Sequence, residues 1–211
     1  MSVQDAYNHW STTYDTDINL TRDLDQAVTR KTLSDSRFQS VIELGCGTGK
    51  NTLFLAEIAE TVHAMDFSAN MLQRAREKIE STLETNNVVF SVADITQSWA
   101  YDDQSIDLIV CNLVLEHIED LSFIFSEATR CLVKGGRFFV CELHPFRQYQ
   151  GKKANFQKGQ ETVEISAFVH HISDFFNAGQ QNGLQLNQLK EWWHTHDHNS
   201  LPRLISFVFE K

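Results

Sequence analysis

The stretch Val41-Ile42-Glu43-Leu44-Gly45-Cys46-Gly47-Thr48-Gly49-Lys50 joins an apolar run, which ends in an acidic residue, to three glycines at alternate positions. Residues 51–56 follow with apolar side chains at helical spacing, so the pattern predicts a strand, a glycine loop and a helix. Glycine lets a ligand approach the backbone closely, and the first N–H groups of a helix are free to donate hydrogen bonds. The stretch therefore favours a site for a nucleoside-containing cofactor, although a structural turn would use the same residues.

Composition limits the classes of protein to consider. A chain of 211 residues fits one domain, and its 42% hydrophobic and 22% charged residues are typical of a globular protein. The formal net charge of -10 argues against a broad nucleic-acid-binding surface, because phosphate binding depends on clustered Lys and Arg. We therefore expect no nucleic-acid partner.

The cysteines and the first residues bear on the cellular compartment. The four cysteines show no CxxC spacing and lie in or beside apolar segments, so we expect reduced, mostly buried thiols in a cytoplasmic protein. Residues 1–5 do not resemble a secretory signal, and no apolar run has the length of a membrane span. We expect no membrane association.

Apolar strands alternate with helices along the first two thirds of the chain. The predicted strands end at or near polar residues: Glu43, Asp66, Asp94, Asn112 and Glu142. Nearly continuous apolar strands separated by helices indicate a parallel sheet covered on both faces. Ligands bind beyond the carboxyl ends of such strands, so these polar residues predict a shared crevice.

The pattern changes after Pro145, but no linker divides the chain. We expect a single domain with four parts: a helical cap at 1–40, a cofactor-binding core at 41–142, a lid or irregular insertion at 145–169, and a helix with a hairpin at 170–211. Tyr7, Trp10 and Tyr14 share a helical face in the cap and are expected to pack against the domain rather than to contact ligand. The terminal hairpin is expected to close the sheet in antiparallel fashion.

Three classes of protein bind a ligand at a glycine loop of this kind, and we compare the sequence with each. A phosphate-binding loop of the Walker type is excluded, since Leu44 stands where its first glycine is needed and Asn51 follows Lys50 in place of Ser or Thr. A dinucleotide-binding loop agrees with Asp66, but its third glycine comes one place early and Glu43 would lie beside a pyrophosphate. A nucleoside that carries positive charge suits these carboxylates better.

On these residues the chain resembles the class I S-adenosylmethionine-dependent methyltransferases, of the type 11 or UbiE-like small-molecule group. The stretch Glu43–Gly49 is similar to the first motif of the family, and Asp66, Asp94 and residues 112–117 follow in the family's order. The resemblance implies a Rossmann-like α/β fold: a seven-stranded, mostly parallel sheet with helices on both faces and an antiparallel C-terminal hairpin.

The resemblance also implies a binding site for S-adenosylmethionine. Its residues would be Glu43, Gly45, Cys46, Gly47, Gly49, Asp66, Phe67, Asp94, Ile95, Asn112 and Leu113. The glycine loop would line the methionine portion and Asp66 would hold the ribose. Asp94 would accept a hydrogen bond from the adenine amino group, and Asn112 with Leu113 would lie near the methyl group.

The implied reaction is an in-line displacement, for which alignment in a water-poor pocket can supply much of the acceleration. His117, His144 and His170 are the candidates for a general base, and each also has a structural interpretation. Residues 194–198 place histidines at alternate positions, but no fourth ligand is evident, so we expect no metal.

The leading hypothesis is a cytoplasmic enzyme, monomeric or homodimeric, that methylates a small-molecule acceptor. Aromatic side chains in the 145–169 segment favour an apolar or aromatic acceptor, and its basic residues Arg147, Lys152, Lys153 and Lys158 suit an anionic one or form a solvated face. Two alternatives stay open: an NAD(P)-dependent oxidoreductase, and a protein that binds S-adenosylmethionine without catalysis.

Overall fold

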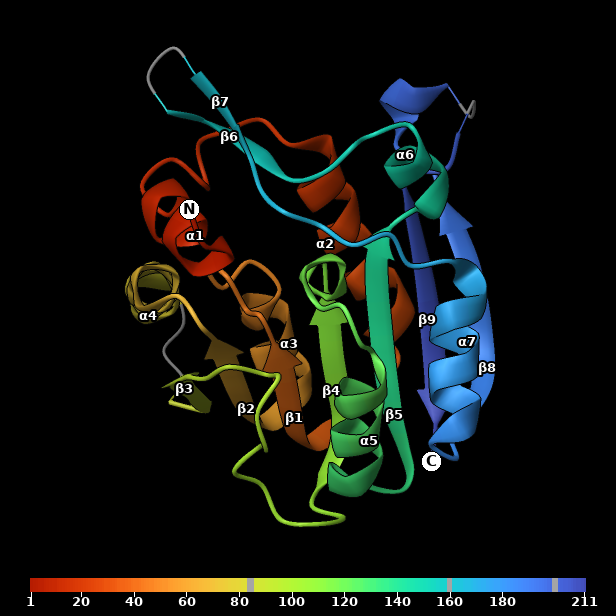
Figure 1. Cartoon of the computed structure of the whole chain (residues 1–211). Coiled ribbons are helices and arrows are strands. Elements are labelled where there is room, and N and C mark those ends of the chain that lie inside the picture. The colour runs from red at the N-terminus through yellow and green to blue at the C-terminus, as the bar shows by residue number, and fades with distance from the viewer. Residues whose placement is uncertain (83–85, 159–160, 199–200) are drawn as a thin grey trace.

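The computed structural model describes residues 1–82, 86–158, 161–198 and 201–211, without the side chain of Lys158. A seven-stranded sheet occupies the centre of the molecule (Figure 1). Its spatial order is β3 (Val88–Val92), β2 (Ala59–Asp66), β1 (Phe38–Leu44), β4 (Ile106–Asn112), β5 (Leu132–Leu143), β9 (Leu204–Glu210) and β8 (Gln185–Trp192). The main helices are α1 (Val3–Trp10), α2 (Leu20–Leu33), α3 (Thr52–Ile58), α4 (Ala69–Thr82), α5 (Ser122–Cys131), α6 (Pro145–Tyr149) and α7 (Ile172–Gln181).

The strand directions confirm the expected fold class. Strands β3, β2, β1, β4 and β5 pair in parallel, whereas β5 with β9 and β9 with β8 pair antiparallel. The predicted C-terminal hairpin is thus β8 and β9, and it adds two strands at the β5 edge. The carboxyl ends of the parallel strands all meet at one edge of the sheet, the upper one in Figure 1.

Alternating side chains of each strand supply two cores, one on each face of the sheet. On β1, Ile42 and Leu44 belong to a cluster with α5 and α7, while Val41 belongs to a cluster with α2 and α3. Figure 1 shows α5 and α7 in front of the sheet and α2 and α3 behind it. Helices are needed on both sides because both faces of the sheet are apolar.

Two predicted boundaries differ from the structure. The helix predicted after the glycine loop is the short α3, because β2 begins at Ala59 and the backbone is already extended there. The strand predicted to end near Glu142 is β5, and it begins before the Gly135-Gly136 pair, at Leu132, since its first residues pair with β4 through a register shift before the regular ladder starts at Arg137. Such a bulge is invisible to a period-two pattern that contains two glycines.

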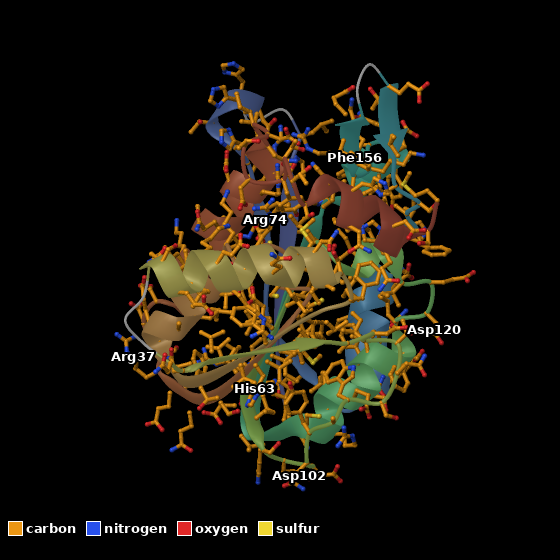
Figure 2. The ribbon with its side chains drawn as sticks, turned by 90° about the vertical axis from the view of Figure 1, so that its left-hand side faces the viewer. Arg37, His63, Arg74, Asp102, Asp120 and Phe156 are labelled. Atoms are coloured by element: carbon orange, nitrogen blue, oxygen red, sulfur yellow. The ribbon has the colours of Figure 1, made fainter. Side chains whose placement is uncertain are left out.

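The 145–169 segment is more regular than expected. It contains α6 and a two-stranded hairpin, β6 (Asn155–Lys158) and β7 (Glu161–Glu164), whose tip at 159–160 lies outside the described residues. Phe156 stacks on Trp10 with ring centroids 5.6 Å apart, which fixes the hairpin beside α1 (Figure 2). The predicted helical cap is α1 and α2, although Tyr14 lies beyond the end of α1. Together α1, α6 and this hairpin lie over the carboxyl edge of the sheet (Figure 1).

The structure bears on the predictions about the cysteines and about membrane spans. All four cysteines are free and buried, as expected. Within the described ranges, none of the helices combines the length and the apolar character that a membrane span requires.

Candidate functional site

The glycine loop after β1 forms the floor of the site. Gly45 has φ +69°, and a Cβ on it would clash with a methyl carbon of Val114, so only glycine fits. Gly47 has φ +55°, and a Cβ there would meet nothing within 4 Å, so its backbone borders open space. Gly49 differs, because its missing Cβ makes room for Ala75 of α4 at 3.2 Å. The first two glycines serve the cavity, and the third serves helix packing.

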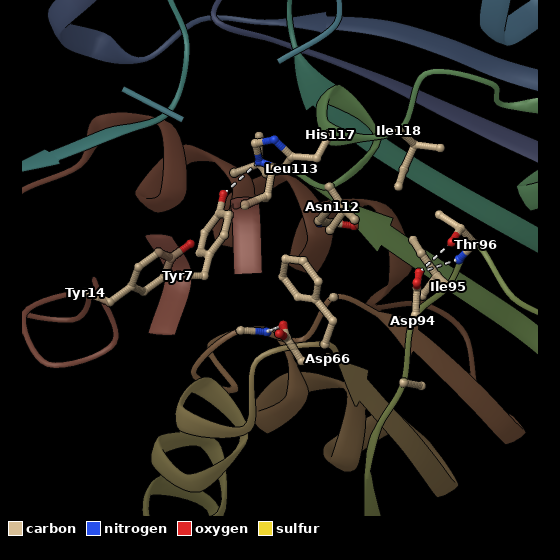
Figure 3. A pocket seen from close by; sticks show the side chains of 16 residues that line it. Tyr7, Tyr14, Asp66, Asp94, Ile95, Thr96, Asn112, Leu113, His117 and Ile118 are labelled. Atoms are coloured by element: carbon tan, nitrogen blue, oxygen red, sulfur yellow. Dashed lines mark hydrogen bonds between the residues drawn. The ribbon is translucent and has the colours of Figure 1, made fainter. Parts of the chain in front are cut away.

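A cavity of about 240 Å³, which we call the main cavity, lies beyond the carboxyl ends of β1, β2 and β4. Most of the residues predicted to bind a cofactor line it: Gly45, Gly47, Asp66, Phe67, Asp94, Ile95, Asn112 and Leu113. Figure 3 shows Asp66, Asp94 and Asn112 arriving from three different strand ends. Three of the five strand-end residues predicted to share a crevice therefore do so. Glu43 does not line the main cavity, and the buried Glu142 carboxylate instead accepts hydrogen bonds from the N–H groups of Val114 and Leu115, at 3.0 and 2.9 Å.

Two carboxyl groups of the main cavity are held by short backbone turns. The buried Asp66 carboxylate accepts N–H hydrogen bonds from Gly47 at 2.9 Å and Ser68 at 2.8 Å, while burial raises its pKa to about 6. The exposed Asp94 carboxylate accepts from the N–H and hydroxyl of Thr96, at 2.9 and 2.7 Å (Figure 3). These contacts orient both groups without consuming all of their acceptor capacity.

A smaller pocket of about 50 Å³, the inner pocket, continues beneath the glycine loop and contains Glu43 and Cys46. It also contains Asp25 from α2, which is only 5% exposed. The side-chain amides of Asn51 and Asn112 donate to the Asp25 carboxylate at 2.8 and 2.6 Å. The side-chain oxygens of both asparagines are buried and have no hydrogen-bond partner within the described structure.

The charge pattern of the inner pocket suits a small zwitterion. Burial raises the pKa of Asp25 to about 6 and that of Glu43 to about 8, because it removes the charged form from water. No cation forms an ion pair with either group in the described part of the chain. A bound cation would stabilise both carboxylates and satisfy the two asparagine oxygens. Arg22 and Lys50 line the same pocket and offer positive charge to a carboxylate. An amino-acid portion with an ammonium and a carboxylate matches this set.

His117 is the one predicted catalytic candidate that lines the main cavity. Its Nδ1 lies 2.9 Å from the carbonyl oxygen of Ser166 and therefore carries the proton, and its Nε2 accepts from the Tyr7 hydroxyl at 2.9 Å (Figure 3). Burial lowers the pKa of His117, which keeps the imidazole neutral at neutral pH. Tyr7 and His117 thus form a hydrogen-bonded pair at the cavity wall.

The other histidines have structural partners. His144 caps α6 by accepting the N–H of Phe146, and its Nε2 lies 2.9 Å from a Glu191 carboxylate oxygen. His170 places Nε2 2.7 Å from the carbonyl oxygen of Ile118. Neither lines the main cavity or the inner pocket. His196 lies in a short 3-10 helix, not a strand, and His194 and His198 flank that helix. The part of the chain that is described contains no cluster of metal ligands.

A third cavity of about 430 Å³, the basic cavity, lies above the first two between the cap and the 145–169 segment. It shares Tyr7, Tyr14 and Leu113 with the main cavity. The charged residues that line the basic cavity are Arg22, Glu116, Arg147, Lys152, Lys153 and Arg203. A molecule in the basic cavity would therefore lie next to one in the main cavity.

The sequence missed two contributions from the cap. Tyr7 and Tyr14 pack as expected, with Tyr14 4.7 Å from Trp10 between ring centroids, but both also line the main cavity. Asp25 lies in an amphipathic helix whose pattern carries no sign that this position faces Asn112, 87 residues away.

Comparison with known proteins agrees with this geometry. The family model for the methyltransferase domain matches residues 42–140. The chain is 27% identical over 160 residues to methyltransferase GfsG of Streptomyces halstedii, covering 75% of this chain and 57% of that one. It is 30% identical over 160 residues to a ubiquinone biosynthesis O-methyltransferase of Xanthomonas oryzae pv. oryzae, covering 74% and 63%. The chain thus spans little more than half the length of these two relatives.

Among solved structures, the fold matches N-methyltransferase NodS of Bradyrhizobium japonicum, whose structure contains S-adenosyl-L-homocysteine. The TM-score is 0.74, with 16% identity, and the match covers 100% of this chain and 99% of that one.

Proposed function

We propose that this chain transfers a methyl group from S-adenosylmethionine to a small-molecule acceptor, as a member of the methyltransferase family whose domain model matches residues 42–140. The observation that carries the proposal is the inner pocket. There, two buried carboxyl groups and two amide oxygens without partners in the described structure lie directly beneath the glycine loop, where they suit a cation.

The residues divide the cofactor between two adjoining spaces. In this proposal Asp25, Glu43 and the oxygens of Asn51 and Asn112 hold the positively charged methionine portion. Asp66 accepts from the ribose hydroxyls, because its carboxylate keeps free lone pairs after the two backbone contacts. Asp94 and Ile95 border the adenine at the far side of the main cavity. Gly49 is left with the packing role described above.

When bound, the cofactor supplies an electrophilic methyl group on a sulfonium. Tyr7 borders both the main and the basic cavity, so its hydroxyl oxygen is positioned to take a proton from an O–H or N–H acceptor while its own proton passes to His117 Nε2. The tyrosine need not ionise on its own, which agrees with burial raising its pKa. We therefore favour Tyr7 with His117 over His144 and His170 as the proton-transfer group.

The proposal includes a cytoplasmic location, supported by the free thiols, and a single domain whose cap and 145–169 segment enclose the acceptor. Calorimetric titration with S-adenosylmethionine, S-adenosylhomocysteine and NAD tests the cofactor, and labelled methyl transfer across a metabolite library tests catalysis. We expect both sulfur compounds to bind and NAD not to bind. Tight NAD binding without a response to either sulfur compound would favour the oxidoreductase alternative.

A further inference from the structure

The basic cavity has an unusual charge for this chain. Five cationic side chains and one carboxyl group line it among the described residues, although the formal net charge of the whole chain is -10. Clustering of one sign in a concave, partly desolvated space raises the local concentration of ions of the opposite sign.

Internal ion pairs neutralise only part of this charge. Arg147 and Arg203 both contact the Asp197 carboxylate, at 2.9 and 2.6 Å, so two guanidinium groups share one carboxylate. Lys153 pairs with the exposed Glu164 at 2.7 Å. Lys152 makes no ion pair within the described ranges.

Arg22 adds a fifth cation with a different set of partners. Its guanidinium donates to the backbone carbonyls of Tyr14 and Asp17, and it lies 3.9 Å from the Tyr14 ring centroid. Carbonyl oxygens and an aromatic face hold the group in place without cancelling its charge. The cavity therefore keeps an excess of positive charge.

One buried carboxyl group, that of Glu116, also lines the basic cavity. Glu116 is 5% exposed, and its Oε2 atom has no hydrogen-bond partner within the described structure. It lies three residues after Leu113, which borders the main cavity as well. Burial raises the pKa of Glu116 to about 7, so above that pH its carboxylate repels an anion and attracts an O–H or N–H donor.

We propose that the basic cavity is the acceptor site, and that it selects an anionic acceptor. The anion contacts Arg147, Lys152 and Arg203, and the O–H or N–H to be methylated faces Glu116, Leu113 and Tyr7. This inference rests on the proposed function for the identity of the reaction, but the anion site itself does not. The aromatic side chains of Tyr7, Trp10 and Tyr14 line the same cavity and suit a flat ring in the acceptor.

Two matched pairs of probes test the charge requirement. 4-Hydroxybenzoate is compared with 4-hydroxybenzamide, and phenyl phosphate with phenol, so that a carboxylate and a phosphate are each set against a neutral analogue. Binding to the full chain is followed by amide chemical shifts of residues 152–155, with and without S-adenosylhomocysteine. We expect at least one anion to bind about 10-fold more tightly than its neutral partner, the scale of one charge-assisted contact.

A double variant and a matched control variant test whether the anion binds in the basic cavity. Lys152→Gln with Lys153→Gln removes two exposed charges from the basic cavity, and Arg37→Gln with Lys134→Gln removes two exposed charges outside it. Figure 2 shows Arg37 well away from Phe156 and the 145–169 segment. Only the first pair should weaken anion binding, by about 3- to 10-fold, as expected for partly solvated contacts.

Each outcome decides between the alternatives. The proposal is overturned if neither anion binds more tightly than its neutral analogue, or if both double variants weaken anion binding equally. A response to phenyl phosphate alone would identify the anion as a phosphate, and a response to 4-hydroxybenzoate alone as a carboxylate. Binding of S-adenosylhomocysteine is measured separately, and failure to bind it would refute the proposed function. Anion binding by a protein that does not bind S-adenosylhomocysteine would still support the anion site.

Discussion

Replacing Asp25 with asparagine tests whether its carboxylate binds the cofactor and lowers the free energy of unfolding of the cofactor-free protein. The substitution removes the charge and nearly preserves the shape. Asn51 and Asn112 now donate to this carboxylate, and their own side-chain oxygens have no partner within the described structure. Because the introduced amide both donates and accepts, rotation of one neighbouring asparagine amide restores a complementary pair. Packing around the position should therefore survive.

The magnitude follows from the pKa of Asp25. Burial raises it from 3.8 to about 6, and at about 1.4 kcal/mol per pKa unit this difference corresponds to about 3 kcal/mol. Because the folded-state pKa is the higher one, the wild-type contribution to the free energy of unfolding is fully present below pH 3.8 and is lost as pH rises through about 6. Asp25→Asn should not show that loss, so it should gain about 1 to 3 kcal/mol over wild type at pH 8 and little near pH 4.

The same substitution should weaken the cofactor complex. Losing a charged hydrogen bond costs about 1.5 to 3 kcal/mol, so S-adenosylhomocysteine affinity should fall about 10- to 150-fold. Urea unfolding at pH 4.5 and pH 8 gives the stability, and calorimetry at pH 8 gives the affinity. Asp35→Asn, an exposed change just after α2, is the control and should alter neither. A variant that is no more stable at pH 8 than wild type, or one that binds the cofactor unchanged, would refute this account of Asp25.

Three further changes address other parts of the site. Asp66→Ala should lower S-adenosylmethionine affinity by about 1 to 3 kcal/mol in calorimetry, and unchanged binding would mean that the ribose does not contact it. Tyr7→Phe should lower kcat by about 100-fold in a labelled-methyl assay with little change in S-adenosylhomocysteine affinity, since the ring packing remains; an equal loss of both would indicate a binding role instead. Gly45→Ala should lower the free energy of unfolding by about 2 to 4 kcal/mol, because the new Cβ would meet Val114, whereas Gly135→Ala, with a similar positive φ and open space, should cost only about 1 kcal/mol in denaturant titrations.

The sequence predicted the strand ends because their signals are local. An apolar run that stops at Asp66 or Asn112 needs only the period of a strand and the polarity of one residue, and the structure has β2 and β4 ending at these two residues. The parallel direction of those strands then places their ends at one edge of the sheet. The residues expected at the cofactor site remain predictions as to role, but most of them do share the main cavity.

The 145–169 segment was harder to predict because its regularity depends on distant contacts. The alternation of residues 161–165 coincides with β7, but β6 is only four residues long and carries no comparable pattern, and its Phe156 is buried against Trp10 from the other end of the chain. Distant contacts also decide which of the three candidate histidines lies at the site. His117 differs from His144 and His170 only in what the folded chain brings beside it, namely Tyr7 and the main cavity.

By itself, the sequence determined the alternation of strands and helices up to β5, the glycine loop and the row of polar residues at the strand ends, since all of these depend on side-chain periodicity and on glycine's freedom to adopt positive φ. Tertiary structure alone decided that Asp25 completes the inner pocket, that Tyr7 pairs with His117, and that Arg203 joins Arg147 in the basic cavity. The physical reason is distance along the chain: Asp25 meets Asn112 across 87 positions and Tyr7 meets His117 across 110. The energies of such contacts appear only after the cap, the sheet and the C-terminal strands have packed together.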